Sequence, residues 1–360
     1  VKSLSVYPDV CAAEHDLKIV YTSIHGTGIT LVPKALEKFG FTNVTIVEEQ
    51  MVPDGNFSTV VYPNPEETEA MTLGLKKAAA INADILLGTD PDADRVAIGI
   101  KNKKGEWFLL NGNQTAALAF NYMIEARKAK GIAQSNDMVI KTIVTTEMIE
   151  AIAKANGVSC YSVLTGFKWI SKMIKEKEGK EKYIIGGEES FGYMVCDFVR
   201  DKDAVTASLL ACEVAAQQKA KSRTLFEYLD TIYKEVGYYR EHLVSLVKKG
   251  KKGAQEIEQI MKDLSTNPLK EIAGSPVVSI EDYNTSTRLD VLNNTTVTLD
   301  IPKSNVLIYY TQDGSKIAAR PSGTEPKIKF YISVQDKQQA NISELLKDKI
   351  NAICTDLNIV

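Results

Sequence analysis

Residues 83–95 read ADILLGTDPDADR, and this stretch decides how the first third of the chain folds. Residues 83–88 form a short apolar run, which is typical of a strand buried in a parallel sheet. The loop that follows carries aspartates at alternate positions, Asp90, Asp92 and Asp94. Because open α/β sheets place their ligands just beyond the carboxyl ends of the strands, we expect this loop to carry chemistry.

The segments before this stretch alternate between strand and helix patterns. Residues 17–22 and 44–47 are short runs rich in β-branched residues, and residues 30–39 between them have helical spacing that ends before Gly40. Residues 66–80 have the pattern of a helix with acidic residues in its first turn. This strand–helix order predicts a parallel sheet covered on both faces.

The same alternation begins again after residue 110 and predicts a second α/β unit, which ends with an alanine-rich helix over residues 203–219. The last third has a different pattern. Asp313 and Gly314 lie between two strand-like runs and indicate a hairpin. The basic run at residues 248–252 is typical of a solvated turn, and residues 342–354 have the spacing of an amphipathic helix.

The predicted fold class is α/β: two related three-layer α/β/α domains followed by a smaller α+β domain with an antiparallel sheet. A chain of 360 residues is too long for one domain at about 150 residues each. The expected boundaries are residues 1–110 for the domain with the metal loop, 111–237 for the second α/β domain and 238–360 for the last domain.

Composition excludes several classes of protein. The 43 basic and 46 acidic residues give a net charge of -3, which argues against nucleic-acid binding and against attachment to an anionic membrane. We find neither an apolar run long enough to span a bilayer nor the pattern of a signal peptide. The five cysteines are scattered and form no CxxC pair, so we expect neither a disulfide framework nor a cysteine zinc site, and a cytoplasmic location.

The three aspartates of residues 90–94 are candidates for a metal site. At an effective dielectric constant near 20, two like charges about 6 Å apart repel by roughly 3 kcal/mol, and a hard divalent cation removes that cost. Oxygen-only ligands favour Mg²⁺, Ca²⁺ or Mn²⁺ over zinc. An EF-hand is excluded, because Arg95 and Lys101 stand where it needs glycine and glutamate. The alternative is an acidic surface turn in which aspartates pair with Arg95.

Residues 320–329 read RPSGTEPKIK and have the composition of a phosphate-binding turn. A turn with glycine presents backbone N–H groups, two hydroxyls and several cations at close range. Arg320 can bind a phosphate with two hydrogen bonds, and strand alternation places Lys327 and Lys329 on one face. The alternative is a solvated turn.

Residues 186–193 read GGEESFGY and follow a predicted strand. The two carboxylates and the hydroxyl of Ser190 can bind sugar hydroxyls or move protons, although a glycine-rich strand end is the alternative. Lys168, at the start of a predicted helix, could reach a substrate. The charged residues 200–203 indicate a helix N-terminus exposed to solvent. His25 lies in SIHGTG, which lacks the third glycine of a dinucleotide-binding turn, so we expect a structural histidine.

Taken together and in this order, these motifs resemble blocks of the α-D-phosphohexomutase superfamily. The resemblance runs through nearly the whole chain and rests on SIHGTG, VPDGNFSTVVYPNPEE, TDPDADR, TGFKWI, GGEESFGY, RDKDA and RPSGTEPKIKFY. The second of these is similar to the phosphoglucomutase/phosphopentomutase branch. Such enzymes interconvert sugar 1-phosphates and 6-phosphates through a bisphosphate intermediate, so the resemblance implies an intramolecular phosphotransferase, with glucose phosphate as the expected substrate and pentose or mannose phosphate as alternatives.

The resemblance also implies roles for individual residues. Mg²⁺ would be held by Asp90, Asp92 and Asp94, with catalytic roles for Arg95 and Lys168. Sugar hydroxyls would bind Glu188 and Ser190, and the phosphate that is not transferred would bind Arg320, Ser322, Gly323, Thr324 and Lys329.

One family feature is not found in these 360 residues. The family's phosphoserine lies in a block containing Ser-His, whereas the three histidines here follow Glu14, Ile24 and Glu241. We therefore expect the phosphoserine domain to be a missing N-terminal part of the same polypeptide, and the chain alone to bind Mg²⁺ and sugar phosphate without turnover. A non-catalytic phosphosugar-binding protein, or a phosphatase with Asp90 as nucleophile, remains the alternative.

Overall fold

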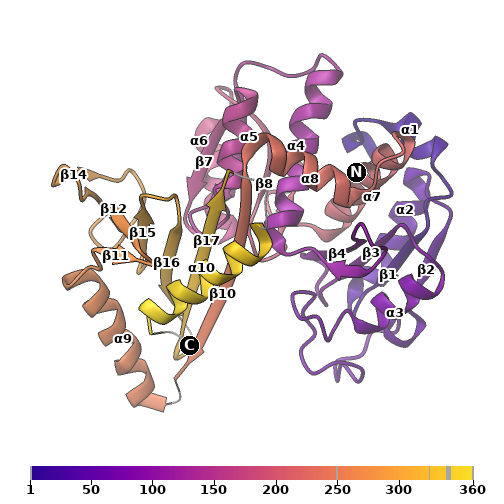
Figure 1. The fold of residues 1–360 in the computed structure, drawn as a ribbon. Coiled ribbons are helices and arrows are strands. Elements are labelled where there is room, and N and C mark those ends of the chain that lie inside the picture. Colours follow the sequence, from indigo (N-terminus) through magenta and orange to yellow (C-terminus); the bar gives the residue numbers. More distant parts are fainter. Residues whose placement is uncertain (1, 249, 324, 338–341, 359–360) are drawn as a thin grey trace. The chain divides into compact units, whose positions relative to one another are not determined.

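The computed structural model describes residues 2–248, 250–323, 325–337 and 342–358. The chain forms two compact units, Val1–Glu235 and Val236–Val360. In Figure 1 the first unit runs from indigo to salmon and contains two sheets, and the second runs from salmon to yellow and contains one. This arrangement confirms the predicted fold class, with two α/β regions followed by an antiparallel α+β region.

The first sheet has the strand order β2-β1-β3-β4-β5. Its parallel part consists of β1 (Ile19–Thr22), β2 (Val44–Ile46) and β3 (Ile85–Thr89), as the alternating pattern predicts. Two antiparallel strands that the sequence interpretation missed, β4 (Val96–Lys101) and β5 (Trp107–Leu109), extend this sheet beyond β3. Residues 90–95, which we call the metal loop after the role predicted for their aspartates, therefore form the connection between β3 and β4.

Helices and turns flank this first sheet. They are η1 (Lys2–Leu4), α1 (Pro8–Ala13), η2 (Thr27–Thr30), α2 (Val32–Phe39), η3 (Glu48–Gln50) and α3 (Thr72–Ala80). Helix α2 ends as predicted at Gly40, which adopts a left-handed conformation with φ of 117°. Helix α3 begins six residues later than predicted. Residues 66–71 instead form successive turns, and the side chain of Glu66 is engaged by Arg95.

The second sheet has the order β7-β6-β8-β9. Strands β6 (Asp137–Thr142), β7 (Ser159–Val163) and β8 (Lys182–Gly187) are parallel, and the short β9 (Tyr193–Met194) is antiparallel. Helices α4 (Gly112–Ala129), α5 (Met148–Asn156) and α6 (Phe167–Lys177) pack against it, followed in the chain by α8 (Leu225–Val236).

Helix α7 (Ala204–Ala220) packs against strands of both sheets in the first unit, β3 and β4 of one and β9 of the other. Fifteen of its 17 residues are buried. A helix that is buried on all sides needs small apolar side chains all round, which explains its alanine-rich sequence. Its N-terminus begins beside the metal loop, where the Ala204 N–H donates to the carbonyl of Ala93 at 3.1 Å.

The second unit is built on an antiparallel sheet of eight strands. They are β10 (Tyr238–Val247), β11 (Glu271–Ile272), β12 (Ser275–Asp282), β13 (Thr287–Asp290), β14 (Thr295–Thr298), β15 (Leu307–Thr311), β16 (Lys316–Pro321) and β17 (Lys327–Asp336). The predicted hairpin joins β15 and β16, with Gly314 at a φ of 82°. Apolar side chains of α9 (Gly250–Thr266) and α10 (Ile342–Asp356) complete the core. Helix α9 starts within the basic run, so the prediction of only a turn there is wrong.

Within the described residues, no helix combines the length and apolar character that crossing a membrane requires.

Candidate active site

The three aspartates of the predicted metal site lie together in the turn after β3. One carboxylate oxygen from each of Asp90, Asp92 and Asp94 lies within 4.8 Å of the other two. The turn is tight because Ala93 adopts a left-handed conformation with φ of 59°, and its N–H donates to the carbonyl of Asp90 at 3.0 Å. Alternate carboxylates thus converge at the carboxyl end of the first sheet.

Asp90 is the buried member of this trio. Its Oδ1 accepts the backbone N–H groups of Asp94 at 3.0 Å and of Arg95 at 2.9 Å, which fixes the carboxylate in the turn. Burial raises the pKa of Asp90 to about 7, the hydrogen bond from Arg95 opposes the rise, and the charges of Asp94 and Asp92 add to it. A cation bound here would favour the charged carboxylate.

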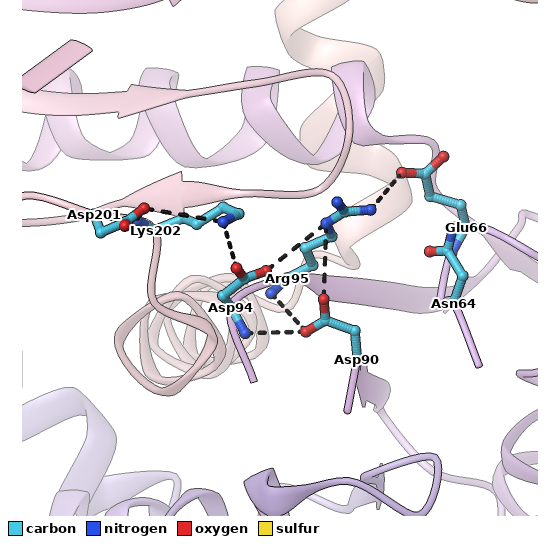
Figure 2. Close-up of polar contacts among 7 residues, drawn as sticks. All are labelled: Asn64, Glu66, Asp90, Asp94, Arg95, Asp201 and Lys202. Carbon is cyan, nitrogen blue, oxygen red and sulfur yellow. Dashed lines mark hydrogen bonds and ion pairs between the residues drawn. The ribbon is translucent and has the colours of Figure 1, made fainter. Parts of the chain in front are cut away.

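Asp94 is held from the second α/β region by Lys202. Its Oδ2 forms an ion pair with Nζ of Lys202, as Figure 2 shows. Its Oδ1 is buried and, among the described residues, accepts no hydrogen bond. Leaving a buried charged oxygen without a donor is costly, so a cation beside this atom fits the site. A donor set of carboxylate oxygens suits Mg²⁺, Ca²⁺ or Mn²⁺.

Arg95 lies between the aspartates and a loop that precedes α3. Its Nε is 3.7 Å from Oδ2 of Asp90 and 3.7 Å from Oδ1 of Asp94, and its Nη1 is 3.4 Å from Oε1 of Glu66 (Figure 2). The Glu66 N–H in turn donates to Oδ1 of Asn64 at 3.0 Å. Sequence reasoning missed Glu66, because the acidic residues 66–67 suggested the first turn of a helix.

The loop of residues 186–193 is hydrogen-bonded to the end of the metal loop. Gly192 pairs with Arg95 in an isolated antiparallel bridge, and the Val96 N–H donates to the carbonyl of Phe191 at 3.0 Å. Phe191 is buried in the core of the first sheet although it belongs to the second region. These contacts bring two of the predicted motifs, separated by about a hundred residues, into one site.

Glu188 is the buried carboxylate of this second loop. Its Oε1 accepts the Gly166 N–H at 2.5 Å, immediately before α6. Burial raises its pKa to about 7, and the neighbouring Glu189 contributes to the rise. Ser190 is partly exposed beside it. Lys168, in the first turn of α6, is exposed, and its Nζ lies 5.3 Å from the ring centre of Trp169.

The turn of residues 23–28 packs against the metal loop and holds it by hydrogen bonds. The Thr27 N–H and hydroxyl both donate to the carbonyl of Pro91, at 2.8 and 3.0 Å. A Cβ on Gly26 would overlap the backbone of Pro91, so glycine is needed there. The His25 ring is 3.0 Å from the Val52 carbonyl and 2.8 Å from the Thr59 hydroxyl, which ties down the long loop before α3. The histidine is structural, as expected.

Residues 200–203 do more than begin a helix. Asp203 is the N-cap of α7 and accepts the N–H groups of Val205 and Thr206, as the sequence suggests. Lys202, however, is only 22% exposed at its side chain, because it turns onto Asp94 rather than into solvent. The expectation of exposed charges is therefore wrong for Lys202, and no local pattern in the sequence identifies its partner.

The predicted phosphate-binding turn lies in the second unit between β16 and β17. Arg320 pairs opposite Lys329 in the antiparallel ladder. The turn is closed by the Ser322 N–H, which donates to the carbonyl of Lys327 at 2.7 Å. A Cβ on Gly323 would meet open space. Thr324 lies outside the described residues.

Comparison with known proteins identifies three family models that match the chain in order. Residues 2–105 match phosphoglucomutase/phosphomannomutase α/β/α domain II, residues 111–236 match α/β/α domain III, and residues 245–343 match the C-terminal domain. A phosphoglucomutase from Staphylococcus haemolyticus is 38% identical over 343 residues, which are 95% of this chain and 61% of that protein. The chain thus spans about three fifths of this relative.

Solved structures show the same fold. The open form of pp63/parafusin, a phosphoglucomutase from Paramecium, gives a TM-score of 0.68 at 18% identity, covering 99% of this chain and 60% of that one. A variant of N-acetylphosphoglucosamine mutase from Aspergillus fumigatus, solved with glucose 1,6-bisphosphate, gives a TM-score of 0.50 at 16% identity, covering 98% of this chain and 65% of that one.

Proposed function

The chain belongs to the α-D-phosphohexomutase superfamily, and from this premise we propose that its polypeptide interconverts sugar 1-phosphate and 6-phosphate, with glucose as the sugar. The reaction would pass through a bisphosphate intermediate. The observation that carries the proposal is the joining of the aspartate loop to the loop of Glu188 through the pairing of Arg95 with Gly192. The glucose 1,6-bisphosphate bound to the Aspergillus mutase supports a phosphosugar ligand.

Asp90, Asp92 and Asp94 are proposed to hold Mg²⁺, which would neutralise charge on the transferred phosphoryl group. The chain's own part is to fix the ligands beforehand. Oδ1 of Asp90 accepts two backbone N–H groups, so the ion would bind through Oδ2, which lies 3.7 Å from Nε of Arg95. The buried Oδ1 of Asp94 accepts no hydrogen bond from the described residues, and only an ion pair with Nε of Arg95 at 3.7 Å faces it, so it is a further ligand atom for the ion.

Arg95 is proposed to bind the transferred phosphoryl group. Its Nε is buried and makes no hydrogen bond to the described residues, because the carboxylates of Asp90 and Asp94 stop 3.7 Å short of it, so its N–H can still donate to a phosphate. Glu66 holds the other end of the guanidinium at 3.4 Å and limits its rotation. A positioned guanidinium stabilises phosphoryl charge without reorganising during the reaction.

Glu188 and Ser190 are proposed to bind hydroxyl groups of the sugar. A carboxyl group with a pKa of about 7 accepts hydrogen bonds when charged and donates one when protonated. Lys168 would bind substrate from the first turn of α6, whose preceding residue, Gly166, already contacts Glu188. The hydrogen bond from Gly166 to Glu188 would keep the loop and the start of α6 together during binding.

The turn between β16 and β17 is proposed to bind a phosphate through Arg320, Ser322, Gly323 and Lys329, together with Thr324. Pairing of Arg320 with Lys329 across the ladder brings two cations onto neighbouring strands. Such a pair repels unless an anion lies between or beside it. The proposed domains of the chain are residues 1–110, 111–237 and 238–360.

The phosphoserine that donates the phosphoryl group is proposed to lie outside these 360 residues. The test measures binding and turnover separately. Calorimetry of the 360-residue chain with glucose 1-phosphate and Mg²⁺ is expected to detect binding, and a mutase assay is expected to detect turnover only in the intact polypeptide. No turnover by the intact polypeptide despite binding would favour a non-catalytic phosphosugar-binding protein and overturn the proposal.

A further inference from the structure

The ammonium group of Lys202 is a positive charge that the fold itself places at the metal loop. Its Nζ forms an ion pair with Oδ2 of Asp94 and lies 3.9 Å from Oδ1 of Asp201 (Figure 2). Asp94 thus has one oxygen on an ammonium group, while its other oxygen lies 3.7 Å from Nε of Arg95 and is buried without a hydrogen bond among the described residues. A single carboxylate therefore faces both a fixed lysine and the proposed metal position.

The position of Lys202 is fixed by its surroundings. A Cβ on Gly192 would come within 2.8 Å of the Lys202 Cδ, so the lysine stem fills the space beside this glycine. The Nζ lies 5.8 Å from the ring centre of Phe167. The neighbouring Asp203 N–H donates to the carbonyl of Tyr193 at 3.1 Å. The backbone hydrogen bond of Asp203 and the packing of the lysine stem beside Gly192 thus hold the ammonium group next to Asp94.

From this geometry we infer that Lys202 is an internal competitor of the divalent cation: it neutralises Asp94 in the metal-free protein and weakens metal binding. The inference rests on the proposed metal site. A divalent cation bound by Asp94 would share this carboxylate with the ammonium group, so the two like charges would repel each other. Even at the dielectric constant of water, charges of two and one about 5 Å apart shift an equilibrium constant by roughly tenfold.

A consequence is that metal occupancy and the contact between the two α/β regions are linked. The ion pair joins the loop after β3 to the segment before α7, so a metal that repels Lys202 loosens this contact. By reciprocity, loosening the contact tightens metal binding. The lysine thus sets the metal affinity of the site from another part of the fold.

The test measures Mn²⁺ affinity of the 360-residue chain by electron paramagnetic resonance of the free ion, without substrate. Lys202→Met keeps the stem that fills the space beside Gly192 and removes the charge, and it is expected to tighten Mn²⁺ binding roughly tenfold. Lys202→Arg keeps the charge and is expected to stay within about threefold of the unaltered chain. Lys202→Gln replaces the methionine variant if the latter fails to fold.

Lys219→Met is the matched control. Lys219 is also partly buried and paired with carboxylates, among them Asp16 at 2.9 Å and Asp84 at 3.9 Å. Asp84 precedes β3 whereas Asp90 follows it, so this lysine lies at the opposite end of the strand. Its removal changes net charge equally, but screening over that distance leaves Mn²⁺ affinity unchanged.

The possible outcomes distinguish a failure of the role of Lys202 from a failure of the proposed metal site. Unchanged or weaker Mn²⁺ binding by Lys202→Met, with Asp92→Asn abolishing binding, overturns the role of Lys202 and leaves the metal site standing. Equal binding by Asp92→Asn and the unaltered chain, or no binding by any variant, overturns the metal site and the inference with it.

Discussion

Gly112 lies directly against the carbonyl oxygen of Glu189, so close that a Cβ on this glycine would overlap that oxygen. Gly112 is the first residue of α4, and Glu189 belongs to the proposed sugar-binding loop. The carbonyl of Gly112 also accepts the hydroxyl of Tyr193 at 2.7 Å. The absence of a side chain at Gly112 therefore sets how closely the loop approaches the helix.

Gly112→Ala is expected to lower the free energy of unfolding by about 2 kcal/mol, because the obstructing atom is backbone that cannot rotate away. The displaced loop should also weaken glucose 1-phosphate binding. Urea unfolding and calorimetry measure the two effects. Gly55→Ala is the control, because a Cβ there meets nothing within 4 Å. A Gly112→Ala chain as stable as the Gly55→Ala chain would contradict the expectation.

Glu188→Gln is expected to stabilise the chain, and only at neutral and alkaline pH. Its pKa rises from 4.5 to about 7 on folding, mainly through burial. Below about pH 4.5 the group is protonated in both states, so it has no effect on stability. Between about pH 4.5 and 7 the unfolded state loses this proton while the folded state still holds it. Stability therefore falls as the pH rises through this window, and the full loss is reached above about pH 7.

The gain from Glu188→Gln at pH 8 is on the order of 3 kcal/mol, since one pKa unit is worth about 1.4 kcal/mol. Urea unfolding at pH 5 and pH 8 measures it. Glu181→Gln is the control of opposite sign. There, hydrogen bonds from Lys177 and Tyr161 outweigh burial and lower the carboxyl pKa. A Glu188→Gln effect that is equal at both pH values would refute the role of burial.

Local patterns in the sequence are enough to predict the elements that carry the site. The apolar run before Asp90 and the glycine of the β15–β16 hairpin are short-range signals, and both indicate the structures that form. Helix α9 was missed although its signal is present. Ile257, Ile260, Met261 and Leu264 recur at helical spacing and pack into the core, but the basic run before them suggested a turn.

Contacts between distant segments could not be predicted in this way. Lys202 reaches Asp94 only because α7 begins against the metal loop, and Glu66 reaches Arg95 only because the loop before α3 does not become helical. The first contact depends on how the two sheets of the first unit pack around α7, and the second on the path of the loop before α3. A charged residue in a helical first turn gives no sign of such a partner.

Glu213 shows the same dependence on packing, at a buried position. It is 1% exposed in the middle of α7. Its carboxylate accepts hydrogen bonds from five groups, the Ser5 hydroxyl, the Val6 and Tyr7 N–H groups, the Cys11 thiol and the Tyr122 hydroxyl. This one residue therefore attaches residues 5–11 to the helix between the sheets.

Glu213→Gln is expected to lower the free energy of unfolding by about 3 kcal/mol, because an amide NH₂ would face donors and leave them unpaired in the interior. Hydrogen exchange should rise at the Val6 and Tyr7 amides. Glu125→Gln on α4 is the control, since Glu125 is exposed and accepts a hydrogen bond from the Tyr228 hydroxyl. A loss below about 1 kcal/mol for Glu213→Gln would show that the cluster tolerates a neutral side chain.

Arg320→Met is expected to weaken binding of glucose 1-phosphate to the 360-residue chain by roughly ten- to a hundredfold. A guanidinium that pairs with a phosphate through two hydrogen bonds contributes about 1.5–3 kcal/mol. Arg320→Lys keeps the charge but not the paired hydrogen bonds, so its affinity should be intermediate. Calorimetry at two ionic strengths measures the loss of affinity. Screening at high salt should make this loss smaller.

The control for Arg320 is Arg288→Met in the same sheet, where the guanidinium donates to the Ser279 hydroxyl at 2.9 Å and lies 5.9 Å from the ring centre of Tyr310. It removes the same charge from β13 rather than from the end of β16. If general attraction by positive charge were the cause, both variants would weaken binding alike. Equal losses would therefore remove the turn from the binding site, whereas a loss confined to Arg320→Met places the phosphate beside Arg320 and Lys329.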